Sequence, residues 1–228
     1  MYRSTNISGR RILKRASWWP FFLVCAVYAA YALFMGALES LSQLGLVAGA
    51  PLRAAPVVFV IHALAGSIVL ISGPLQFNRR LSGRWTKLHR VLGRVYVVTI
   101  WLASTSGLWN AIFFEVAPVA KIVFGMLSIL WFGTTTIALL RILRRDVAAH
   151  REWMIRSFSL SLFFVSFSFW VPGLASTRLP EAVSYPLAVF LSWSLNLMVA
   201  ELWIRITRSH ARQSSTSMKG KYALEGVN

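Results

Sequence analysis

Three histidines near apolar segments are the residues best suited to hold a cofactor: His62, His89 and His150. An ionisable side chain is costly to place in a membrane, so it marks a functional site there by default. His62 also has Gly66 one turn away on the same helix face, and a helix histidine beside a small residue can hold haem b. The alternative for His62 is a neutral imidazole that is hydrogen-bonded to a Ser or Thr of a neighbouring helix.

His89 and His150 share a local pattern, because each is followed by an arginine and then by a second arginine within six residues. Three interpretations remain open: axial ligands of one haem iron, metal ligands together with Asp146 or Glu152, or part of an arginine-lined pocket for an anionic headgroup, a quinone head or a phosphate. Guanidinium groups suit bidentate binding of such anions. The predicted cofactor-binding residues are therefore His62, His89, His150, Arg90, Arg94 and Arg156.

Depth separates these histidines into two groups. His62 lies about six residues inside one end of its apolar run, whereas His89 and His150 lie at the opposite boundary. The difference in depth is about 20 Å by helix rise. One haem iron cannot bridge that distance, so a haem or metal site at the second boundary would rest on His89 and His150. The arginines have a simpler alternative role, in which they set the topology and contact lipid headgroups.

Six charge-free runs must position these side chains: 16–38, 54–78, 95–114, 122–140, 157–177 and 182–200. A run of about 20 residues spans the hydrocarbon core of a bilayer. Only helices and closed barrels satisfy their own backbone in lipid. At this length the sequence predicts an all-α membrane bundle with six transmembrane helices, at about 17–38, 56–77, 91–114, 117–140, 157–176 and 186–204.

The basic residues predict the orientation of this bundle. The chain has 24 Lys and Arg against 7 Asp and Glu, and all but Arg53, Lys121 and Arg178 fall on one side of the alternating segments. The positive-inside rule therefore places both termini in the cytoplasm. Anionic lipids of the inner leaflet are the expected partners of these charges, rather than nucleic acid.

The resulting division is a basic cytoplasmic N-terminus (1–16), a six-helix transmembrane domain (17–205) and a disordered cytoplasmic tail (206–228), in a protein of the cytoplasmic (inner) membrane. The serines of the fifth helix are expected to supply interhelical hydrogen bonds. Glu152 is expected to pair with Arg156 four residues on. Glu201 is expected to face the bundle or to pair with an arginine.

These motifs together resemble an uncharacterised bacterial membrane-protein family, domain of unknown function 2306. The resemblance covers about residues 55–205 and implies a multi-helix membrane protein with no established reaction. Members often carry a further arginine in helix five, where this chain has Ser168. The residues that carry the resemblance are His62, Gly73-Pro74-Leu75-Gln76-Phe77, Leu88-His89-Arg90, Gly93-Arg94-Val95-Tyr96, Ala149-His150-Arg151, Trp153-Met154-Ile155-Arg156-Ser157, Asn196, Ala200-Glu201 and Trp203.

The leading functional hypothesis is a membrane protein that binds a redox cofactor, haem b or a quinone, or an anionic lipid-like ligand at the cytoplasmic rim. Electron transfer is its candidate activity. The first alternative is a small transporter or channel whose path is lined by His62, Asn196 and Glu201. The second is a noncatalytic assembly or anchoring subunit, with a membrane protein or a second copy of the chain as its partner.

Overall fold

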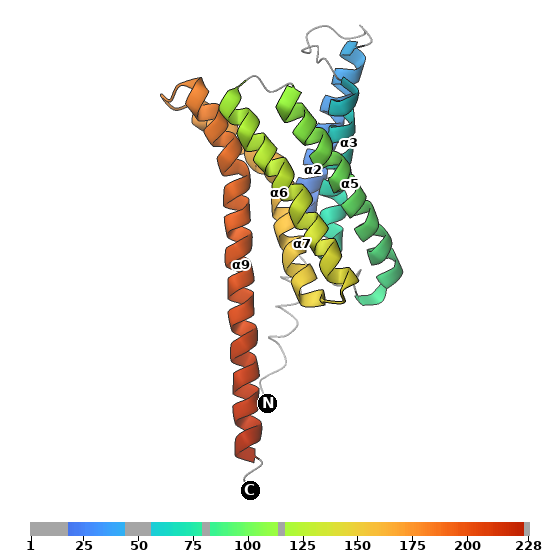
Figure 1. The fold of residues 1–228 in the computed structure, drawn as a ribbon, viewed down its shortest axis with the longest axis vertical. Helices are drawn as coiled ribbons and strands as arrows, with labels where there is room; N and C mark the ends of the chain where they lie inside the picture. Colours follow the sequence, from blue (N-terminus) through green and yellow to red (C-terminus); the bar gives the residue numbers. More distant parts are fainter. Residues whose placement is uncertain (1–17, 44–55, 79–82, 114–116, 226–228) are drawn as a thin grey trace.

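The computed structural model describes residues 18–43, 56–78, 83–113 and 117–225, with backbone only at 18, 43, 56 and 210–225. The predicted basic N-terminus, 1–16, lies outside these residues. The described part of the chain forms seven helices and no strand (Figure 1). They are α2 (Trp18–Gln43), α3 (Pro56–Gln76), α5 (Thr86–Phe113), α6 (Pro118–Leu143), α7 (Val147–Ser161), α8 (Phe163–Ala175) and α9 (Glu181–Glu225).

Six stretches of helix are long and apolar enough to cross a membrane, and their mean hydropathy ranges from 1.3 to 2.1. Helices α7 and α8 together make one of them, Val147–Ala175. This confirms the predicted all-α fold with six spans. Its cause is the length of the charge-free runs, in which every backbone amide must be satisfied within its own helix. The orientation of the termini stays a prediction.

Helices α3, α5, α6 and α7 form a ring of four. Going around the ring, α3 packs on α5, α5 on α6, α6 on α7, and α7 on α3. The two remaining pairs, α5 with α7 and α3 with α6, have no Cα atoms within 8 Å of each other in the described residues. These pairs are therefore the diagonals of a four-helix bundle, whose core holds Val69, Tyr96, Ile100, Trp131 and Phe158 among others.

Two helices cover this ring from outside. Helix α2 packs along α3, and α9 packs on α6, α7 and α8. Figure 1 shows α9 extending well beyond the end of the bundle at which α5 and α7 begin. We call that end the basic end, because Arg90, Arg94, Arg141 and Arg144 lie there. Helix α9 continues to Glu225, through residues of the segment 206–228 that is predicted to be a disordered tail.

Helices α5 and α7 begin earlier than the sequence predicted, at Thr86 and Val147 instead of 91 and 157. The prediction started each helix near its charge-free run, but the basic residues before those runs are helical too. Asp146 caps α7, since its carboxylate accepts a 3.0 Å hydrogen bond from the backbone amide of Ala149, as an N-cap residue should. As a result, His89 and His150 are each the fourth residue of their helix.

Candidate functional site

A buried tyrosine links the two diagonal helices α5 and α7. The side chain of Tyr96 on α5 is fully buried. Its hydroxyl lies 3.1 Å from Oγ of Ser157 and 3.4 Å from Oγ of Ser161, both on α7. Because α5 and α7 do not approach each other closely, Tyr96 fixes the distance and the register between them.

Helix α6 joins the same hydrogen-bond network. Oγ1 of Thr135 lies 2.7 Å from Oγ of Ser157, and the indole of Trp131 donates to Oγ of Ser161 at 3.0 Å. All these side chains are buried. Networks of this kind strengthen in a low-dielectric interior and fix a single packing arrangement. The prediction that serines of the fifth helix supply interhelical hydrogen bonds is confirmed.

The network places His89 and His150 at the same level. His89 precedes Tyr96 by seven residues and His150 precedes Ser157 by seven, and both helices begin at the basic end. Seven residues make two helical turns, or about 10 Å of rise, and return to the same helix face. The two histidines therefore lie two turns from the Tyr96–Ser157 hydrogen bond, on the faces that α5 and α7 turn toward each other.

Each imidazole of this pair is half-buried, and their surroundings differ. Nδ1 of His150 lies 2.8 Å from the backbone oxygen of Ala138 on α6, so Nδ1 carries the proton and donates it. Nε2 is then the nitrogen with the lone pair. Nδ1 of His89 is buried and has no hydrogen-bond partner among the described residues.

His62 lies elsewhere in the bundle. Its Nδ1 lies 2.8 Å from the backbone oxygen of Ala103 on α5, and a β-carbon on Gly107 would lie 3.0 Å from its Cε1. Ala103 follows His89 by 14 residues on α5, which is about 21 Å of helix rise. The depth separation inferred from the sequence therefore agrees with the packing, and His62 is not brought together with the other two histidines.

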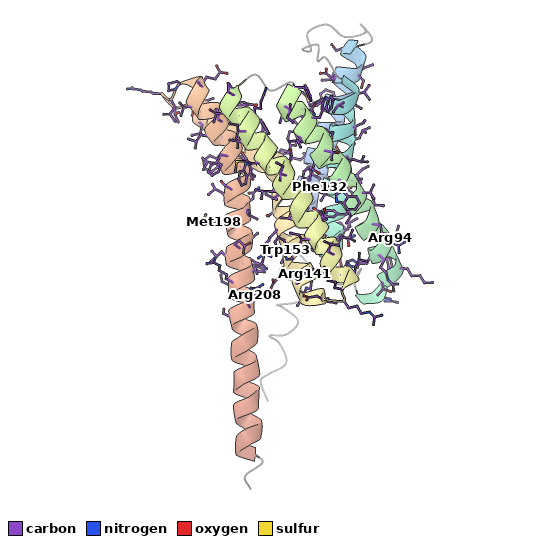
Figure 2. The ribbon with its side chains drawn as sticks, in the orientation of Figure 1. Arg94, Phe132, Arg141, Trp153, Met198 and Arg208 are labelled. Atoms are coloured by element: carbon purple, nitrogen blue, oxygen red, sulfur yellow. The ribbon has the colours of Figure 1, made fainter. Side chains whose placement is uncertain are left out.

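The three predicted arginines do not converge on the histidine pair as buried groups. Arg90 and Arg94 are exposed, and Figure 2 shows Arg94 on the outer side of α5. The guanidinium of Arg156 makes a bidentate ion pair with Glu201 on α9, at 2.5 and 3.1 Å, and stacks on the ring of Trp153. The role of these arginines as anion ligands stays a prediction.

The predicted Glu152–Arg156 pair is wrong. Glu152 instead pairs with Arg208 on α9, in the region between α7 and α9 that Figure 2 shows. Both carboxylate–guanidinium pairs therefore run between helices and join α7 to α9. The prediction relied on spacing within one helix, and the arginine on α9 offers Glu152 a bidentate partner. The expectation that Glu201 faces the bundle or pairs with an arginine is confirmed.

The geometry does not support a metal site in which Asp146 or Glu152 joins the two histidines. Asp146 caps α7 and lies 3.8 Å from Arg141, while Glu152 is engaged by Arg208. Within the described ranges, no group of three His, Cys, Asp or Glu side chains is arranged to hold a metal ion. What the structure places at one level of the bundle is the pair His89 and His150.

Comparison with known proteins gives the family. The family model described as predicted membrane protein (DUF2306) matches residues 59–204, more than half of the chain. The chain belongs to this family. The match begins just before His62, includes the histidine pair and the Tyr96 network, and ends just after Glu201. No curated protein and no solved structure matches the chain.

Proposed function

We propose that this DUF2306 protein binds one haem b between α5 and α7, that the imidazoles of His89 and His150 would hold its iron, and that the protein transfers electrons at the basic end of the bundle. The observation that carries the proposal is the position of the two imidazoles. They lie at one level on diagonally opposite helices of a four-helix bundle, as the equal spacing from Tyr96 and Ser157 requires. Cofactor sites in such bundles are built from side chains on facing helices.

The chemistry of the two side chains fits this group. Histidines that bind iron usually donate the other ring nitrogen to a carbonyl or carboxylate, which fixes the ring and its tautomer. His150 does so through Ala138 and keeps Nε2 for a ligand. His89 holds a buried nitrogen without a partner, although buried polar atoms in folded proteins are normally paired.

The residues around the pair would hold the group in place. The Tyr96, Ser157 and Thr135 network crosses the bundle two turns farther in and spaces α5 from α7. Gly93, one turn after His89, presents no side chain. A haem with two imidazole ligands supplies one-electron transfer. If the basic residues lie inside, as their distribution predicts, electrons would be exchanged at the cytoplasmic face.

One haem per chain is the expected stoichiometry. His62 is separated from the pair by about 21 Å of helix rise, and its imidazole is seated against Ala103 and Gly107. We accordingly assign His62 a role in helix packing, in place of the role as a cofactor ligand that the sequence suggested.

Titration of the purified protein with haemin tests this function. We expect a Soret band that saturates at one haem per chain, because one pair of imidazoles would hold one iron, and that shifts when the iron is reduced. The absence of a Soret band in both redox states, for protein purified in mild detergent and supplied with haemin, would overturn the proposal.

A further inference from the structure

A buried glutamine lies next to the histidine pair. Gln76 is the last residue of α3 and is 9% exposed. Its Oε1 would lie 3.6 Å from a β-carbon placed on Gly93 of α5. Gly93 follows His89 by four residues, one helical turn. The amide of Gln76 therefore lies against α5 within about one turn of His89.

Two buried polar atoms without partners lie near this place, and a third lies one turn farther into the bundle on α3. Nε2 of Gln76, Oγ of Ser72 one turn earlier on α3, and Nδ1 of His89 all lack a hydrogen-bond partner. They are half of the six such side-chain atoms in the part of the chain that the structure describes. Leaving a buried polar atom unpaired is costly. Gln76 and His89 each hold one within about one helical turn of each other, which points to a common ligand.

We propose that Gln76 is a further binding residue of the ligand held by His89 and His150, and that its amide donates to an oxygen acceptor of that ligand. An amide NH₂ can only donate, so the ligand must present an acceptor, such as a carboxylate or carbonyl oxygen, toward α3. Haem b carries this chemistry in its propionates, and a quinone carries it in its ring carbonyls. This inference rests on the proposed site. It states that the ligand must carry a hydrogen-bond acceptor on the side that faces α3.

Substitution of Gln76 gives the test. Gln76→Leu removes the donor and keeps similar bulk, and Gln76→Glu puts a carboxylate in its place. We expect Gln76→Leu to bind the ligand roughly tenfold more weakly, the equivalent of one lost hydrogen bond to a charged group. Gln76→Glu should bind haemin more weakly still, because two carboxylates then face each other. Asn110→Leu is the matched control, since Asn110 also has a buried oxygen without a partner, near the far end of α5.

Melting temperatures separate this role from simple packing. Without ligand, Gln76→Leu should melt at or above the wild-type temperature, because an unpaired buried amide has been removed. With haemin or a short-chain quinone, its ligand-induced rise should be smaller than that of wild type and of Asn110→Leu. If the rise in melting temperature caused by haemin depends on Gln76, the acceptor is a haem propionate. If the rise caused by the quinone depends on Gln76, the acceptor is a quinone carbonyl.

The two proposals fail in different ways. If the ligand requires His89 and His150 but binds Gln76→Leu as tightly as wild type, the inference about Gln76 is overturned and the proposed site stands. If a quinone alone binds, and its binding depends on Gln76, the inference is supported and the haem assignment falls. If neither compound raises the melting temperature of the wild-type protein, both proposals are overturned.

Discussion

Replacing His150 with alanine will abolish stoichiometric haem binding by the purified protein. The substitution removes one of two axial ligands. Loss of an outer-shell partner alone typically costs roughly 10- to 100-fold in affinity, and loss of a ligand should cost more. His89→Ala should have the same effect. The measurement is the haem-to-protein ratio after haemin titration and gel filtration.

Two comparisons make this result specific to ligation. His89→Ala removes a nitrogen that has no partner among the described residues, so its fold should be unharmed. His62→Gln keeps a polar side chain that can reach Ala103 and should retain one haem per chain. If His62→Gln lost haem while His89→Ala bound it fully, His62 and not His89 would be the ligand, and the assignment made here would be contradicted.

Replacing Gly73 with alanine should lower the free energy of unfolding by about 1–3 kcal/mol, the cost of overpacking a core. A β-carbon at Gly73 would lie 2.1 Å from Cε2 of Phe158, which is far inside any allowed contact. Phe158 cannot move aside freely, because it is 5% exposed and packs against Phe21 and Phe77. Gly73 is thus the residue that lets α3 close the four-helix ring on α7.

Gly66→Ala on the same helix is the control. No atom lies within 4 Å of the position its β-carbon would take, and alanine is the better helix former. It should be as stable as wild type or more so when unfolding is followed in mixed detergent micelles. Phe158→Leu should restore part of the stability of Gly73→Ala. Equal stability of the two alanine variants would contradict the packing described here.

The chain's charge distribution was enough to predict its architecture. Long runs without Asp, Glu, Lys or Arg leave only the helix as a spanning structure, and six spans were found. Helix rise alone also separated His62 from His89 and His150. Both predictions depend on properties that are local along the chain, so no knowledge of packing was needed.

Contacts between different helices could not be predicted from properties that are local along the chain. Arg156 was expected to hold a ligand or to pair with Glu152, but Glu201 on another helix is its partner. Tyr96 and Gln76 were missed as site residues because each lies in an apolar helix with nothing local to mark its partner. One signal was present: Tyr96 follows His89 by seven residues, as Ser157 follows His150. Using it requires knowing that α5 and α7 face each other.

The electron paramagnetic resonance spectrum of the ferric haem in the purified protein tests the central claim most directly. Two imidazole ligands from His89 and His150 should give a low-spin signal in the wild-type protein. Removing either one should convert whatever haem remains to the high-spin form. A high-spin wild-type signal, or a low-spin signal that persists in both His89→Ala and His150→Ala, would contradict a haem held between α5 and α7.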